Sequence, residues 1–260
     1  MLKLLKFEFT RKKTVFLVAC LMVILGEAYA LFKYYQMDES MRYFANNEIF
    51  GIFVAFLTFG FGMLYLVDII TLLRQDMFKQ EGYMLFMTPF NGYQILGSKV
   101  IFALCEGFFI GLIYLAIVVA NGKIMGVTDF GFIYEFGNLD ANEIWMVIKG
   151  ILVGILSIVE FALTIFLSFA LFKSIFTDVR FKGAITFGIF IGIILIKGQV
   201  LNLVTSLVGN SMDLFNASIS HVNYVSNIHM ALNISMGYVL VMSALLFAMT
   251  GYLLEHKINL

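Results

Sequence analysis

Six long apolar stretches dominate this sequence and restrict what it can fold into. They cover residues 14–32, 49–73, 95–120, 145–172, 184–207 and 232–254. The hydrocarbon core of a bilayer is about 30 Å thick, and a helix needs about 20 apolar residues to cross it. The stretches are too long and alternate too little for barrel strands, whereas a helix satisfies its own backbone groups in lipid. The sequence therefore predicts an all-α polytopic membrane protein with six transmembrane helices.

The charge content agrees with this prediction. Of the 260 residues, 61% are hydrophobic and only 13% are charged, whereas soluble domains carry about 25% charge. The 17 basic and 17 acidic residues cancel, so no overall field attracts a polyanion. These values exclude an ordinary soluble enzyme, a disordered protein and a nucleic-acid binder, and they favour a single membrane domain over residues 1–260.

The distribution of lysine and arginine predicts the orientation, since cytoplasmic loops carry the excess of these residues. With the N-terminus in the cytoplasm, three basic residues lie in outer loops: Lys33, Arg42 and Lys123. Twelve lie in cytoplasmic segments: Lys3, Lys6, Arg11, Lys12, Lys13, Arg74, Lys79, Lys99, Lys173, Arg180, Lys182 and Lys257. Both termini are therefore expected in the cytoplasm.

A cleaved secretory signal is an alternative for the first stretch. Residues 14–26 precede Ala28-Tyr29-Ala30, which resembles an A-x-A cleavage site. The apolar run continues past this site through Phe32, and Glu27 lies just before it. We therefore favour an uncleaved chain with six spans over a mature chain with five.

Two further segments are expected to lie at the membrane surfaces. Residues 1–13 interleave leucine and phenylalanine with charged side chains, which predicts an N-terminal interfacial helix; a flexible basic tail is the alternative. Residues 208–230 are too polar to span and too apolar for a solvated loop. We expect short re-entrant helices there, between spans five and six, dipping into the outer leaflet.

The sequence lacks the motifs of an enzyme. Gly92 and Gly97 have the spacing of a nucleotide-binding loop, but Ser98 stands where lysine is required. H-E-x-x-H and G-x-S-x-G are absent. The histidines, His221, His229 and His256, lie outside the predicted spans, where surface or capping roles are the default. We therefore predict no catalytic, cofactor-binding or metal-binding residue.

The segment between the second and third spans, residues 74–99, is the most informative. A polar start leads to an apolar cluster that ends at Pro89, which stops a helix. Asn91-Gly92 then supplies a turn before the chain re-enters the bilayer. Exposed aromatic residues on a cytoplasmic helix suit a surface that docks on a partner protein. The alternative, in which these side chains fold back onto the membrane, explains them equally well.

This segment resembles the first cytoplasmic loop of ABC type-2 exporter permeases. The likeness rests on Glu81-Gly82, Leu85, Thr88-Pro89, Ile95 and Ser98-Lys99, and the six-span architecture extends it to the whole chain. In that family the loop carries a coupling helix that docks on a separate ATPase subunit. Tyr83 departs from the pattern, in which many members carry a small threonine. The resemblance implies that the following residues form the contact: Glu81, Gly82, Tyr83, Leu85, Phe86, Thr88 and Pro89.

The resemblance also implies partners. ATP and magnesium would bind on the ATPase, and two permeases, identical or related, would pair mainly through their first and fifth spans. Gly188 and Gly192 in span five, and Gly150 and Gly154 in span four, permit close helix packing, which serves packing within the chain equally well. The expected location is the bacterial cytoplasmic membrane.

Five ionisable residues fall within the predicted spans: Glu27, Asp68, Glu106, Glu160 and Lys197. Each is costly if it faces lipid, so each should face protein or a translocation path. We expect Glu27 to pair with Lys197, and Asp68 and Glu106 to lie near Arg74 or Lys99. Glu160 has no evident partner, which makes it our candidate for a substrate path. Structural pairing and a role in transport both remain open for the set.

The function that these observations favour is the membrane subunit of an ATP-driven exporter. Spans rich in phenylalanine, methionine and leucine suit an amphiphilic substrate such as a peptide, a drug or a lipid-like molecule. The alternatives are a secondary transporter driven by an ion gradient and a non-transporting immunity or scaffold protein. The only proline lies outside every predicted span, whereas secondary carriers often use broken helices.

Overall fold

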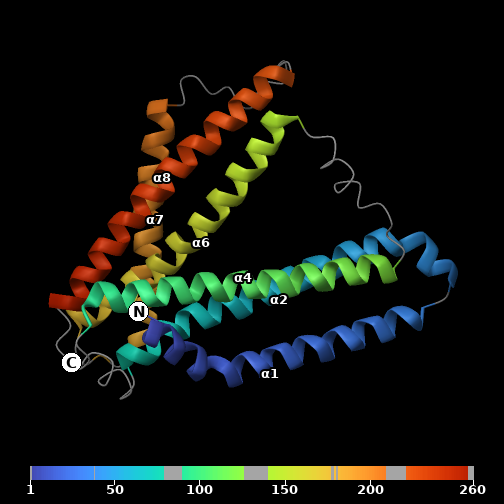
Figure 1. Cartoon of the computed structure of the whole chain (residues 1–260), viewed down its shortest axis with the longest axis horizontal. Coiled ribbons are helices and arrows are strands. Elements are labelled where there is room, and N and C mark those ends of the chain that lie inside the picture. The colour runs from blue at the N-terminus through green and yellow to red at the C-terminus, as the bar shows by residue number, and fades with distance from the viewer. Residues whose placement is uncertain are drawn as a thin grey trace. The chain divides into compact units, whose positions relative to one another are not determined.

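The computed structural model describes residues 2–37, 39–78, 90–125, 140–176, 179, 181–208 and 221–256 (Figure 1). Within these ranges the chain is helical and contains no strand, so the predicted all-α class is confirmed for them. The helices are α1 (Leu2–Tyr35), α2 (Glu39–Phe78), α4 (Gly92–Ile124), α6 (Ala141–Ile175), α7 (Lys182–Val208) and α8 (His221–His256).

Five helices are long and apolar enough to cross a membrane. They are Phe50–Met77, Gly92–Ile124, Ala141–Ile175, Lys182–Val204 and Ile228–His256. They correspond to the second to sixth predicted spans and confirm a multi-pass membrane protein. The first predicted span lies in α1, which is not among the five. The side chains of residues 13–17 in α1 lie outside the description, and the first of the six predicted spans, residues 14–32, stays a prediction.

The apolar faces of these helices point outward, as lipid requires. Ile52, Phe56, Phe59 and Met63 follow one another at helical spacing along α2, and Phe56 is 76% exposed. A helix rises 1.5 Å per residue, so the 40 residues of α2 span about 60 Å, twice the hydrocarbon thickness. α2 is therefore expected to extend well beyond the membrane.

The described helices belong to two compact units. The first comprises Met1–Asp68 and Cys105–Gly137, and the second comprises Ile69–Leu104 and Asn138–Leu260. Helices α2 and α4 are each divided between the two units, α2 after Asp68 and α4 before Cys105. Each unit is described below on its own.

In the first unit, side-chain contacts define the directions of three helices. Lys12 on α1 contacts Glu106 on α4, and Glu27 further along α1 contacts Asn121 further along α4. Helices α1 and α4 therefore run parallel. Thr58 on α2 shares a hydrogen bond of 2.8 Å with Tyr114, and α2 runs antiparallel to both. This is the alternation expected of three successive spans.

In the second unit, α6 packs against α7 and α8 (Figure 1). The rings of Phe161 on α6 and Phe190 on α7 meet edge to face with centroids 6.1 Å apart. Eleven residues of α6 are buried, most of them between Ala162 and Phe172. Helix α6 begins after Asp140, whose backbone N–H donates to Oε2 of Glu143 (3.0 Å) and so satisfies one free donor at this helix end.

The N-terminal segment differs from the interfacial helix that we expected. Residues 2–35 form one continuous helix. Glu8 and Lys12 are buried, whereas Phe7 and Phe9 are 48% and 45% exposed. Glu8 and Lys12 thus face the protein together with Leu4, whereas Lys6 is exposed along with Phe7 and Phe9. The polar partners available to Lys12 explain this arrangement.

The expected re-entrant pair is only partly within the described residues. Residues 221–230 form the first turns of α8 rather than a separate helix. Residues 209–220 lie outside the described part of the chain, as do residues 79–89, where the coupling helix is predicted.

Candidate functional site

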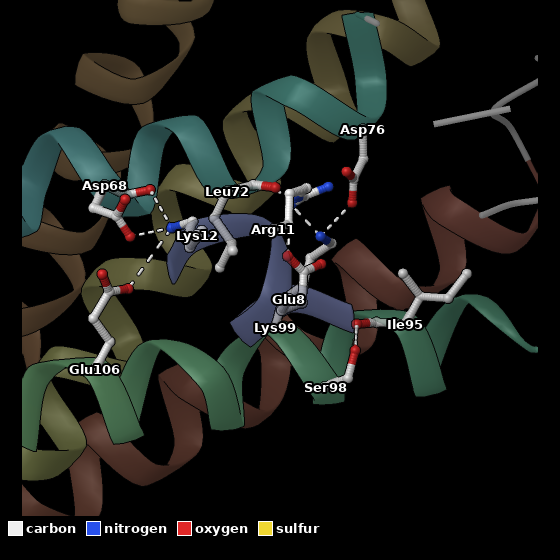
Figure 2. Close-up of polar contacts among 10 residues, drawn as sticks. All are labelled: Glu8, Arg11, Lys12, Asp68, Leu72, Asp76, Ile95, Ser98, Lys99 and Glu106. Carbon is white, nitrogen blue, oxygen red and sulfur yellow. Dashed lines mark hydrogen bonds and ion pairs between the residues drawn. The ribbon is translucent and has the colours of Figure 1, made fainter. Parts of the chain in front are cut away.

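A buried lysine with two carboxyl groups occupies the first unit (Figure 2). Lys12 forms an ion pair with Asp68 through Oδ2, and its Nζ also donates to the Asp68 carbonyl oxygen (3.3 Å). Oε2 of Glu106 lies 3.7 Å from the same Nζ. The three side chains come from α1, α2 and α4 and are 8%, 15% and 10% exposed. One ammonium group therefore serves two carboxyl groups in a place with little water.

A tyrosine borders this lysine-centred cluster. A Cβ atom on Gly107 would lie 3.1 Å from the hydroxyl oxygen of Tyr65, so the absence of a side chain at Gly107 makes room for the phenol ring beside Glu106. At another level of the same unit, Asn121 Nδ2 donates to Oε1 of Glu27. Glu27 on α1 and Glu106 on α4 thus have partners of different kinds, an amide for Glu27 and a lysine for Glu106.

The second unit contains a buried ion pair at the base of the predicted cytoplasmic loop. Lys99 near the start of α4 pairs with Asp76 near the end of α2, and both side chains are 1% exposed. Lys99 Nζ also donates to the Leu72 carbonyl oxygen (3.3 Å; Figure 2). The two helix ends that flank residues 77–98 are therefore joined.

The start of α4 also packs against the end of α8. A Cβ atom on Gly92 would lie 3.0 Å from both the Glu255 backbone nitrogen and Leu254 Cβ. The ring of Tyr93 covers Gly251 so closely that a side chain there would collide with it. A side chain at Gly251 would therefore force Tyr93 to move, and one at Gly92 would require its neighbours to shift by a few tenths of an ångström.

A second buried ion pair joins α6 and α7. Lys197 Nζ lies 3.0 Å from Oε1 of Glu160 and donates to the hydroxyl of Thr164 (3.0 Å). Thr164 in turn donates to the Glu160 carbonyl oxygen (2.8 Å). Tyr238 on α8 donates to the Lys197 carbonyl oxygen (2.9 Å). Three helices therefore meet at one polar cluster in an otherwise apolar interior.

Several expected pairings were wrong. Glu160, for which we found no partner in the sequence, contacts Lys197, and Glu27 contacts Asn121. Asp68 and Glu106 meet Lys12, which we had placed in the N-terminal interfacial helix, and Lys99 meets Asp76. The partners of these residues depend on helix rotation.

The predicted packing glycines have no neighbour in the described chain. A Cβ atom on Gly188 or Gly192 would meet nothing within 4 Å, and the same holds for Gly150 and Gly154. Packing within the described residues therefore does not explain either glycine pair. The residues predicted to contact an ATPase lie outside the described part of the chain: Glu81, Gly82, Tyr83, Leu85, Phe86, Thr88 and Pro89.

Sequence reasoning missed Lys12, Asp76 and Asn121. The sequence held a signal for Lys12, because Leu4, Glu8 and Lys12 recur at four-residue spacing and so lie on one face of a helix. In the structure all three side chains are buried. Asp76 offered no such pattern, since it lies among polar residues at a span end. Within the described residues no group of three or more histidine, cysteine or acidic side chains could hold a metal ion.

Comparisons with protein-family models, with characterised proteins and with solved structures gave no match to this chain.

Proposed function

We propose that this chain is the membrane-spanning permease subunit of an ATP-driven exporter in the bacterial cytoplasmic membrane. A separate ATPase subunit would bind and hydrolyse ATP, and a second permease copy would complete the path for an amphiphilic substrate. The proposal starts from the likeness of residues 81–99 to a permease coupling loop. Five apolar helices support a multi-pass membrane protein, and the bias of basic residues is consistent with cytoplasmic termini.

The observation that carries the proposal is the Lys99–Asp76 ion pair. Lys99 belongs to the Ser98-Lys99 element of the coupling-loop pattern, and it is buried against the end of the preceding span. Separating two such buried charges is strongly unfavourable because each would be left without a partner. A force on the loop would therefore move the ends of α2 and α4 together, as a coupling segment requires.

The contacts of Gly92 and Tyr93 extend this connection to α8. Tyr93 packs on Gly251 and faces Phe247, with ring centroids 6.1 Å apart. A displacement of the loop would thus reach three spans through closely packed contacts. Only different contacts with the two nucleotide states of an ATPase could drive such a displacement.

The parallel course of α1 and α4 supports the first predicted span, residues 14–32. Helix α4 is apolar enough to cross the membrane, and α1 contacts it through Lys12–Glu106 and Glu27–Asn121. A helix that lies along a spanning helix over this length is best accommodated by crossing the membrane with it.

A co-purification experiment tests the proposal. The tagged chain is expressed with an ABC ATPase encoded beside it, and Leu85→Arg is compared with Phe132→Arg, a matched change in the predicted outer loop. We expect the wild type and Phe132→Arg to retain the ATPase and Leu85→Arg to lose it, together with substrate-stimulated hydrolysis. Retention of both by Leu85→Arg would show that the loop is not the coupling segment.

A secondary transporter is the second candidate, and the intramembrane charges are the observation that favours it. Carriers use buried acids and lysines to bind ions or protons. The chain alone in liposomes would then show flux that depends on an ion gradient and needs no nucleotide. Absence of such flux, with nucleotide-dependent flux in the presence of an ATPase, would favour the exporter.

A further inference from the structure

The connection between α6 and α7 combines positive charge with exposed apolar side chains. Residues 173–182 carry three basic side chains and one acidic side chain, which are Lys173, Arg180, Lys182 and Asp178. Ile175 at the end of α6 is 64% exposed, and Phe181 directly before α7 is 71% exposed. A segment of this composition suits the boundary between water and hydrocarbon, where charged groups and apolar groups both find their preferred surroundings.

The two flanking helices place this connection at a membrane surface. Helix α6 ends at Ile175 and α7 begins at Lys182, and both helices are long and apolar enough to span. The apolar run of α7 starts at Ala184, about 3 Å along the helix axis from Lys182. The chain between Ile175 and Lys182 is short, so these helix ends lie at most about 25 Å apart. Both lysines therefore lie near the level at which acyl chains give way to headgroups.

The end of α6 gives Lys173 a defined position. Phe172 is buried, and its ring stacks on the ring of Phe176 with centroids 5.6 Å apart. The Phe176 N–H donates to the Phe172 carbonyl oxygen (2.8 Å). Lys173 follows Phe172 directly, so its side chain leaves the helix about 100° away from this anchored residue. Lys173 is partly buried and forms no ion pair within the described part of the chain, and Lys182 is exposed.

Such a surface distinguishes lipids by their charge. The phosphate of an anionic phospholipid has no positive group beside it, whereas phosphatidylcholine carries its own cation. Near a membrane surface each lysine favours anionic lipid by about five-fold. The lysine stems can lie along hydrocarbon while the ammonium groups reach the phosphate, and Ile175 and Phe181 can contact the acyl chains. A free phosphate ion would use the lysines but neither apolar side chain.

We propose that the α6–α7 connection binds the headgroups of anionic phospholipids through Lys173 and Lys182, with Ile175 and Phe181 against the acyl chains. Arg180 adds a third positive charge to the segment. The bound lipid holds the joined ends of α6 and α7 at one depth in the membrane. This inference rests on the multi-pass character of the chain and does not depend on ATP-driven export.

The single tryptophan of the chain, Trp145, permits a test by fluorescence. Trp145→Phe removes it, and Phe181→Trp places a reporter at the connection. The full-length chain is reconstituted in phosphatidylcholine vesicles that contain brominated phosphatidylglycerol or brominated phosphatidylcholine, because bromine quenches a tryptophan that it contacts. At low salt we expect the brominated anionic lipid to bind at the reporter about five-fold more tightly or better. Lys173→Gln with Lys182→Gln should lose most of this preference, and high salt should weaken it.

A matched variant separates a local site from a general effect of charge. Lys33→Gln with Lys123→Gln removes the same charge from other helix ends, and the reporter chain should then keep its preference. Inorganic phosphate at constant ionic strength should not displace the anionic lipid. Equal binding of the two brominated lipids, equal effects of the two double variants, or displacement by phosphate would each overturn the proposal. Ile175→Trp serves as the reporter if Phe181→Trp does not fold, and its lipid preference is decisive without the lysine variants.

Discussion

Lys197 on α7 lies 3.0 Å from Glu160 on α6, and the two side chains are 17% and 10% exposed. This ion pair lies within helices that are otherwise apolar and long enough to cross a membrane. Each charge is acceptable there because the other one neutralises it. Thr164 and Tyr238 add hydrogen bonds to Lys197 from two helices.

Removing one partner of this pair should destabilise the protein strongly. Lys197→Met leaves Glu160 buried without a counter-charge, and breaking a buried pair in this way costs about 3–5 kcal/mol. Lys197→Met with Glu160→Gln removes both charges and should recover a large part of that loss. Thermal unfolding of the purified variants, followed by circular dichroism, measures both effects. Equal destabilisation by the single and double changes would contradict this prediction.

The Lys99–Asp76 pair should restrain the loop that it closes. Lys99→Met or Asp76→Asn leaves one buried charge unpaired, so the loop base should open more often. We expect several-fold faster tryptic cleavage after Lys79 in inverted membrane vesicles. Lys149→Met, which removes a lysine elsewhere, should cleave like the wild type. Unchanged cleavage in both loop-base variants would show that the pair does not restrain the loop.

Two glycines on α8 should respond in opposite ways to the same substitution. Gly251→Ala places a methyl group against the Tyr93 ring, and overpacking of this kind costs about 1–3 kcal/mol. Gly237→Ala meets nothing within 4 Å and should be neutral or stabilising by up to about 1 kcal/mol, because alanine favours helix. Thermal unfolding distinguishes the two variants. Adding Tyr93→Ala should reduce the destabilisation caused by Gly251→Ala. The same addition to Gly237→Ala should bring no such recovery of stability.

The orientation predicted from lysine and arginine can be measured by cysteine labelling. Cys20 and Cys105 are first changed to serine, and Asp129→Cys or Lys257→Cys is then introduced. A membrane-impermeant maleimide should label the first in intact cells and the second only after the membrane is opened. Labelling of Lys257→Cys in intact cells would place the C-terminus outside and exclude the proposed topology.

The helices themselves could be predicted because they depend on local sequence alone. An apolar run of membrane length has few alternatives to a helix, since lipid offers no partners for backbone groups. Five predicted spans correspond to helices of this kind. The extension of α1 to Leu2 was harder to foresee, because its charged residues suggested an interface until Lys12 proved to be buried.

The sequence by itself determined that this chain is helical, apolar and multi-pass, and it identified Glu27, Asp68, Glu106, Glu160 and Lys197 as residues that need partners. Only the tertiary structure decided which partners they have. Consecutive residues turn about 100° around a helix axis, so a small change in rotation brings a different side chain to the same interface. Lys12 and Asp68 are 56 positions apart, and no local pattern connects them. Their contact exists because α1 and α2 pack with these two faces together, a choice that depends on the whole unit.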